Sequence, residues 1–244
     1  AGDRGFLDRG LNPPNGGSLG TVDFQHASKS FSPATMTANL SGTVIGETMS
    51  HGMSFSMGGI NACTTAPLYF ASSITGSTFN PYAVPIGFQV AGDAHLLSVF
   101  TSAPLRSRQL SEYFGDLLTR AATPFELPAQ HPVPVVSNAG GPYKRPSSVT
   151  TGLPAEFNTF SAITFIGQTT FRGGFISASA GWIGGGNVTL VLPDFSALSG
   201  WDNIWAPTTG ESVQVTTVSS GNSAITSCSP GNRGVGASYG PVTI

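Results

Sequence analysis

The chain has 244 residues, of which 39% are hydrophobic and only 9% are charged, and its formal net charge is −2. Its ten basic side chains form no basic run, which excludes the positive surface that nucleic-acid binding needs. The hydrophobic fraction is large enough to bury a core, and so little charge favours association between molecules. We therefore expect a folded protein with no nucleic-acid partner.

The first segment, residues 1–31, carries no strand or helix pattern. It contains Asp-Arg-Gly twice, at Asp3 and Asp8, and is otherwise rich in Pro, Asn and Gly. We interpret it as an extended N-terminal arm, which either lies on a neighbouring subunit or is a solvated terminus.

The segment Thr48–Met57 alternates between small residues and soft or apolar ones, which is the period of a β-strand. The soft or apolar positions are Met49, His51, Met53, Phe55 and Met57. Thioether and imidazole groups are ligands for Cu(I), so Met49, His51, Met53 and Met57 form a candidate copper site. Met and Phe at alternate positions more commonly fill a core, and we expect no metal and no cofactor.

Further short strands are expected where apolar residues alternate between Gly, Pro, Asn or Ser boundaries. They cover residues 36–46, 66–74, 84–91, 95–100, 156–166, 187–193, 212–219 and 223–228. Residues 231–244 are interpreted as a C-terminal tail. This pattern predicts an all-β fold, an antiparallel β-sandwich of jelly-roll or immunoglobulin-like type.

One segment, residues 105–131, has a different period. Its apolar residues recur at three and four positions: Leu110, Tyr113, Phe114, Leu117, Leu118 and Ala121. The opposite face carries charges at steps of four: Arg108, Glu112, Asp116 and Arg120. We expect an amphipathic helix that begins after Ser107, ends before Pro124 and closes one end of the sandwich.

The sequence also resembles itself at an offset of 121 residues. Thr43–Gly59 aligns with Thr164–Ala180 with six identities in seventeen positions. We infer two related β units, residues 32–104 and 132–230, on either side of the connection at 105–131. The second copy has no soft ligand at the positions of the methionines, which argues against a copper site.

Two cysteines, Cys63 and Cys228, allow a single disulfide, and with few lysines they suggest an exported, oxidised protein. Two buried free thiols are the alternative. A bridge would close a loop of about 165 residues and contribute at most about 5 kcal/mol in the chain-entropy model. No apolar run approaches the roughly 20 residues of a membrane helix, so we expect a secreted or extracellular-surface protein.

No motif for catalysis is present in the sequence. The four histidines (His26, His51, His95 and His131) are scattered, without a zinc-binding spacing. The segment Gly52-Met53-Ser54-Phe55-Ser56 lacks the closing glycine of a Gly-x-Ser-x-Gly nucleophile motif, and no helix pattern follows it. We therefore expect a protein that is not an enzyme.

All three tryptophans lie within 24 residues of each other. Trp201 and Trp205 flank Asp202 and Asn203, and aromatic rings beside short polar side chains suit a sugar-binding face. Packing of the two rings beneath a loop or at a subunit contact is the alternative.

These expectations point to a non-catalytic structural protein, secreted or carried on a particle. It would assemble with its own copies or with partner proteins into a filament, surface layer or shell, through a weakly charged β surface and flexible termini. The alternative function is a carbohydrate-binding module that uses the Trp-rich segment.

Overall fold

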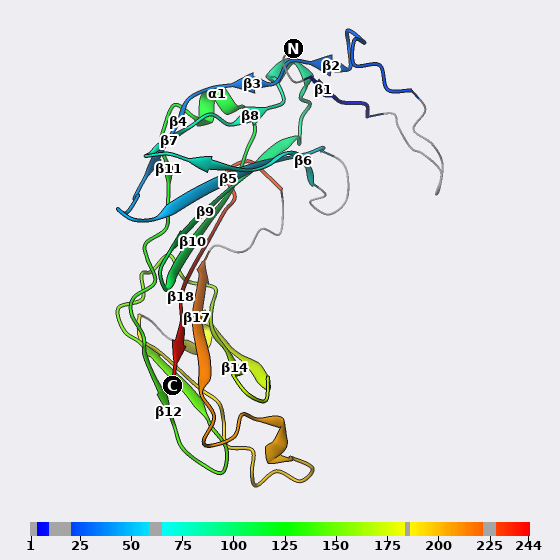
Figure 1. Cartoon of the computed structure of the whole chain (residues 1–244). Coiled ribbons are helices and arrows are strands. Elements are labelled where there is room, and N and C mark those ends of the chain that lie inside the picture. The colour runs from blue at the N-terminus through cyan, green and yellow to red at the C-terminus, as the bar shows by residue number, and fades with distance from the viewer. Residues whose placement is uncertain (1–3, 10–20, 59–64, 184–185, 222–227) are drawn as a thin grey trace.

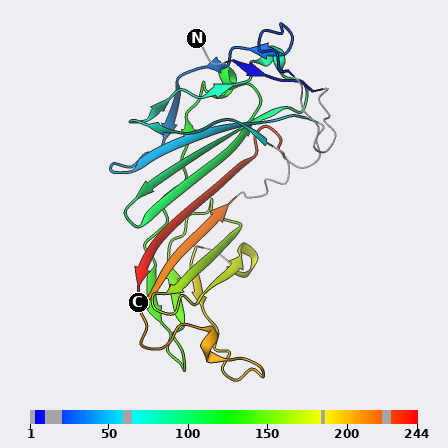
Figure 2. The same ribbon diagram turned by 45° about the vertical axis from the view of Figure 1, so that its right-hand side comes forward.

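The computed structural model describes residues 4–9, 21–58, 65–183, 186–221 and 228–244, and it is mostly β-strand. Eight strands form one antiparallel sheet, seen in Figure 2 as a twisted surface along the length of the molecule. In spatial order they are β15 (Gly173–Ser179), β14 (Phe160–Gly167), β17 (Val213–Gly221), β18 (Arg233–Thr243), β10 (Arg106–Phe114), β9 (Ala94–Ala103), β5 (Thr48–Ser56) and β6 (Thr65–Ile74).

Four smaller sheets accompany the large one (Figure 1). Two have three strands: β11 (Phe125–Glu126), β4 (Ala38–Ser41) and β7 (Thr78–Phe79), and β12 (Val135–Asn138), β13 (Pro146–Thr150) and β16 (Val188–Val191). Two have two strands: β3 (Ala34–Thr35) with β8 (Tyr82–Ala83), and β1 (Gly5–Phe6) with β2 (Ser30–Phe31). The helical turns are η1 (Ile86–Phe88), α1 (Leu117–Arg120), α2 (Ala180–Ile183) and η2 (Asn203–Trp205).

The main core lies between the large sheet and the three-stranded sheets. Leu40 from β4 and Leu190 from β16 are buried in the same cluster as Leu97 from β9 and Val215 from β17. This shared core explains why apolar side chains alternate along the strands, because each strand presents one face to it.

The strand expected over Thr48–Met57 is confirmed for Thr48–Ser56, which form β5. β5 lies between β9 and β6 in the large sheet. Met53 and Phe55 are buried, whereas the small residues between them are more exposed. The alternation in the sequence therefore reflects one covered face of the strand.

The amphipathic helix predicted within residues 105–131 is wrong. Arg106–Phe114 form β10, which pairs with β9 on one side and β18 on the other, and only Leu117–Arg120 are helical. Every residue from Leu110 to Phe114 is buried, so this end of β10 is covered on both faces. A strand covered on both faces loses its alternation, and its apolar residues then fit a helical spacing as well.

The C-terminal tail predicted at residues 231–244 is also wrong, because β18 is a central strand of the large sheet. Its glycines obscured the strand pattern. Gly240 has φ +129°, and a Cβ there would lie 2.7 Å from the Val215 carbonyl oxygen. Glycine is thus required at this point, where the pairing with β17 shifts register between Val215 and Thr217.

Two of the smaller strand predictions have other outcomes. Residues 84–91 form no strand, because Pro85 precedes the short helix η1. The strand predicted at 223–228 falls almost entirely on residues outside those described. The other expected strands coincide at least in part with strands of the structure.

The described part of the N-terminal arm lies on its own chain. β1 pairs with β2, and Leu7 N donates to Lys29 O at 2.8 Å. Arg9 Nη1 donates to Asp93 Oδ1 at 3.0 Å, and the Asp93 carboxylate also accepts from the Gly58 and Val90 amides. Asp93 is therefore the residue that anchors the arm to the β-sheet.

The two halves of the chain contribute four strands each, in the same order. The first half contributes β6-β5-β9-β10 and the second contributes β15-β14-β17-β18, and they meet at the β10–β18 pair. The offset of 121 residues does not superpose these strands: it sets β5 against the turn after β14 and against β15. The shared strand order is thus independent of that alignment.

Candidate functional site

The candidate copper ligands on and after β5 are divided between two clusters of apolar side chains. Met53 is buried in the main core and Met49 packs against that core, whereas Met57 packs against a second cluster around Phe55. The ring of His51 lies 4.6 Å from the Phe79 ring, centroid to centroid. Within the described ranges, no three His, Cys, Asp or Glu side chains are grouped so that they could hold a metal ion. The three methionines are packed among apolar side chains.

The proposed disulfide joins one cysteine inside the described residues to one outside them. Cys63 lies outside the described residues, and Cys228 lies half-buried in the segment that leads to β18. The pairing of the two cysteines stays a prediction.

The Trp-rich segment forms a loop between β16 and β17 at one end of the molecule (Figure 1). Trp201 is half-buried, and its ring lies 4.9 Å from the ring of Phe195 and 5.6 Å from that of Tyr143. The ring of Trp205 meets that of Trp201 edge-on at 5.4 Å and is itself 57% exposed. Trp201 therefore packs against the core, whereas Trp205 lies at the surface.

The polar members of the Trp-rich segment have partners within the loop. Asp202 caps η2 by accepting a hydrogen bond from Ile204 N at 2.9 Å. Asn203 Oδ1 accepts from Trp201 Nε1 at 3.0 Å. The structure thus brings together the four predicted residues, but only Trp205 offers an open ring face.

Two histidines that looked scattered in sequence are buried structural groups. His95 Nδ1 is 2.7 Å from Gly115 O and its Nε2 accepts from Val84 N at 2.9 Å. His131 Nε2 is 3.1 Å from the Ser219 hydroxyl, and both residues are almost fully buried. Burial lowers the pKa of both imidazoles, which therefore stay neutral near pH 7.

These groups predict that the protein loses stability in acid. A histidine whose folded pKa is lowered contributes stability above its unfolded pKa of about 6.5, and this is lost as the pH falls below that value. Burial raises the pKa of Glu47 and Asp93, but the hydrogen bonds from arginine and other neighbours, together with the arginine charge, outweigh it and lower the pKa of both. We therefore expect melting temperatures that are constant from pH 8 to 7, fall below about pH 6.5 and fall more steeply below about pH 4.5.

The measurement is a series of thermal melts across this pH range. His131→Gln should reduce the fall in melting temperature that begins below about pH 6.5. His26→Gln, at an exposed position, is the control variant. Stability that rises between pH 7 and 5.5 would contradict the expectation.

The buried ion pair between Glu47 and Arg108 was not foreseen. Their side chains are 1% and 2% exposed, and Arg108 Nε donates to Glu47 Oε1 at 3.0 Å. Arg108 Nη1 also donates to the carbonyl oxygens of Gly42 and Pro128. The pair thus fastens β10 to the segment that precedes β5 and to the chain after β11.

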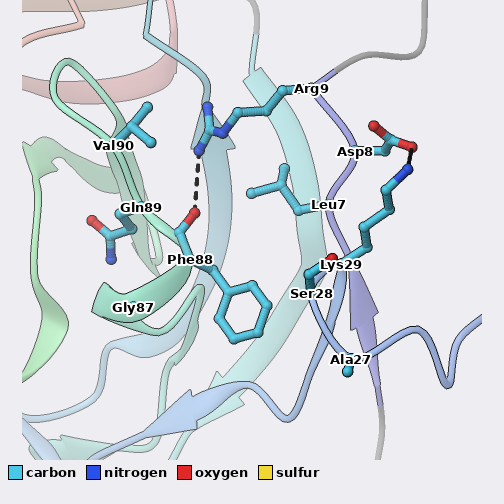
Figure 3. Close-up of a pocket in the computed structure, with 10 residues that line it drawn as sticks. All are labelled: Leu7, Asp8, Arg9, Ala27, Ser28, Lys29, Gly87, Phe88, Gln89 and Val90. Atoms are coloured by element: carbon cyan, nitrogen blue, oxygen red, sulfur yellow. Dashed lines mark hydrogen bonds and ion pairs between the residues drawn. The ribbon is translucent and has the colours of Figure 1, made fainter.

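A cavity of about 540 Å³ lies between the N-terminal arm and η1 (Figure 3). Its charged side chains have partners within the chain: Lys29 pairs with Asp8, and Arg9 pairs with Asp93 and donates to Phe88 O. This cavity lies where the arm packs against the segment around η1, and we assign it no ligand.

Three exposed apolar side chains lie on the β14–β15 hairpin. We call Ile166, Phe171 and Phe175 the hairpin patch; they are 41%, 76% and 60% exposed. Phe171 lies in the turn between the strands with φ 56°, a conformation that bulky residues rarely adopt. Exposed aromatic residues on one hairpin make it a candidate surface for contact.

Hydrogen bonds to the Glu211 side chain fix the turn of this hairpin. The Glu211 carboxylate accepts hydrogen bonds from the Thr169, Thr170 and Thr208 amides at 2.6–3.1 Å. These bonds, with that of Thr170 first among them, lower the pKa of Glu211 to about 2. The hairpin patch is therefore presented by an anchored turn.

β15 is an edge strand that lacks the usual protection. Among the described strands it pairs only with β14, in unbroken register, and Gly173–Ser179 contain no charged residue and no proline. The opposite edge, β6, contains Pro67 and pairs with β5 through two register shifts. Charge, proline and bulges are the devices that prevent edges from pairing, so β6 is protected and β15 is open. The absence of charge and proline in Gly173–Ser179 was the available sequence signal.

No helix within the described parts of the chain is long and apolar enough to cross a membrane. Comparisons of the chain with protein-family models, with curated proteins and with solved structures find no match in any of the three.

Proposed function

We propose that the protein is a non-catalytic structural subunit, secreted or carried on a particle, that assembles with copies of itself into a filament, surface layer or shell. The observation that supports this most is the open β15 edge with the hairpin patch beside it. An unprotected edge presents a row of backbone donors and acceptors that a strand of another molecule can satisfy.

The low surface charge supports the same proposal. With 9% charged residues and a net charge of −2, approaching molecules repel each other weakly. Further large apolar side chains are exposed elsewhere, including Ile45, Trp182 and Val135. Assembly would cover some of these groups.

We further propose that the chain arose by duplication of one β-sandwich unit. Each half supplies four neighbouring strands in the same order, and each half also carries a pair from a small sheet, β4 with β7 and β13 with β16. This correspondence pairs β5 with β14 and β6 with β15.

Size-exclusion chromatography with light scattering, followed by negative-stain electron microscopy, tests the assembly proposal. We expect particles well above the 25.0 kDa of one chain. Deletion of residues 1–20 tests whether the N-terminal arm contributes. A protein that stays at the monomer mass at every concentration and pH would refute the proposal.

Carbohydrate binding remains the second candidate because Trp205 and Ile204 are exposed side by side, at 57% and 56%. Its stacking residue is Trp205, since Trp201 is engaged with Phe195 and Tyr143. We expect Trp205→Ala to abolish glycan-array binding without changing the melting temperature. Trp201→Ala should instead destabilise the protein by about 3 kcal/mol, because it empties a packed site.

A matched pair of melts and glycan-array profiles for these two variants separates the roles. Wild-type protein that binds no glycan disposes of this candidate. A strong loss of stability in Trp205→Ala would contradict the assignment of Trp205 to the surface.

A further inference from the structure

We infer that β15 is a two-fold interface, at which β15 of one molecule pairs antiparallel with β15 of a second copy and joins the two large sheets. This inference rests on the proposed self-assembly and specifies its contact. The yellow hairpin that ends in β15 borders the sheet in Figure 2, where a further strand can be added.

The direction of the free backbone groups follows from the pairing of β15 with β14. Gly167 N donates to Arg172 O at 2.8 Å, so the facing residues 167 and 172 form a hydrogen-bonded pair. Such pairs recur at every second residue of an antiparallel ladder, which places Gly174, Ile176 and Ala178 with their backbone groups toward β14. The backbone groups of Phe175 and Ser177 therefore point to the open edge.

These directions restrict the possible registers between two copies. Only residues whose backbone groups point outward can exchange hydrogen bonds across the new seam. The register with the greatest overlap centres the two-fold axis on Ile176, the middle residue of Gly173–Ser179. Phe175 then faces Ser177 of the second copy, and Ile176 faces its own counterpart.

The side chains of β15 are compatible with this register. Ile176 packs against the main core of its own molecule, so the contact between two Ile176 side chains would connect the two cores. No charge meets a like charge, because Gly173–Ser179 carry none. A strand that faces itself must be self-complementary, and β15 meets this condition.

The same register brings the remaining exposed aromatic residues together. The turn that carries Phe171 would lie beside α2 of the second copy, because residue 171 falls opposite residue 181 when the axis passes through Ile176. α2 carries Trp182, which is 84% exposed, the highest value among the described tryptophans. One contact would therefore cover Phe171, Phe175 and Trp182.

The open edge does not pair with β6 of another molecule in this scheme. Pro67 lacks a backbone N–H, and the register shifts between β5 and β6 distort the β6 edge. A β15–β6 contact would be head-to-tail and would generate a ring or an open fibre, whereas the β15–β15 contact closes as a dimer. Larger assemblies would then be built from these dimers through other surfaces.

The first test is sedimentation velocity of Ser177→Lys across a concentration series. Across the two-fold axis the two lysines would lie diagonally, about 7–8 Å apart, and their repulsion should weaken dimerisation at least about tenfold. The matched control is Ser73→Lys, an exposed serine on β6, which should leave dimerisation unchanged. Circular dichroism melts of both variants verify that the fold is retained.

The second test reports the register directly. Facing residues that are not hydrogen-bonded have Cα atoms about 4.5 Å apart, which is within reach of a disulfide. Ile176→Cys should therefore give a covalent dimer under mild oxidation, whereas Ser73→Cys and the wild-type protein should not. Crosslinking that depends on residue 176 supports the two-fold pairing even if the lysine variant is destabilised.

The outcomes distinguish this inference from the proposed function. If the wild-type protein assembles but Ser177→Lys assembles equally well and Ile176→Cys forms no covalent dimer, the β15 interface is wrong and self-assembly stands. If the wild-type protein is monomeric throughout, both are wrong. Loss of dimer in Ser177→Lys, with the dimer retained in Ser73→Lys, supports both.

Discussion

Arg108→Met is expected to lower the free energy of unfolding by about 3–5 kcal/mol, because it leaves the buried Glu47 carboxylate without its counter-ion. The Gly42 and Pro128 carbonyl oxygens would lose their donor as well. Urea unfolding followed by intrinsic fluorescence measures the change, provided that the slope with urea concentration is the same as in the wild-type protein.

The matched control is the double variant Arg108→Met with Glu47→Leu. Replacing both members of a buried ion pair by apolar residues removes the uncompensated charge, so the double variant should be more stable than Arg108→Met alone. Recovery should be incomplete, because Gln130 Nε2 also donates to Glu47 and would lose that bond. Additive losses from the two substitutions would contradict the pairing.

Phe125→Ala is expected to cost about 3–5 kcal/mol, the range for emptying an aromatic site in a core. Phe125 is fully buried, and its ring lies 5.9 Å from that of Phe79 and 6.0 Å from that of Phe114. Arg120 Cζ lies 3.9 Å from the centre of the same ring, a cation–π contact that the substitution would also remove.

The matched control for this substitution is Phe100→Ala. Phe100 lies on β9 but is 44% exposed, so its removal leaves no cavity and should cost at most about 1 kcal/mol. The same urea titration applies to both variants. Equal losses for the two phenylalanines would show that the ring cluster around Phe125 is not the centre of the core.

The regions where prediction failed share a physical cause. Arg106–Phe114 read as a helix because the far end of β10 is covered on both faces, which removes the period-two signal. Arg233–Thr243 read as a tail because its three glycines leave few side chains to form a pattern, and one of them, Gly240, is required by close packing against β17. In both cases the neighbouring strands determine the local sequence, and those strands are distant in the chain.

The candidate site was predicted in part. The sequence indicated the location of Trp201 and Trp205 but not that one is in the core and the other at the surface. It also contained the uncharged stretch Gly173–Ser179, but whether such a strand lies at an edge or in the middle of a sheet depends on which partners it finds. Met49 and Met53 pack in one apolar cluster and Met57 in another. Which cluster a side chain joins also depends on residues distant in the chain.

By itself, the sequence determined that this is a weakly charged, mostly β protein, because alternation along Thr48–Ser56 and frequent turn residues are local properties. Only the tertiary structure decided that β18 is central and that Arg108 meets Glu47, 61 positions away. The same is true of β15, which is left open at the edge of the sheet. Strand order and ion pairing arise from contacts between residues that are distant in the chain. A local sequence pattern does not identify those distant partners.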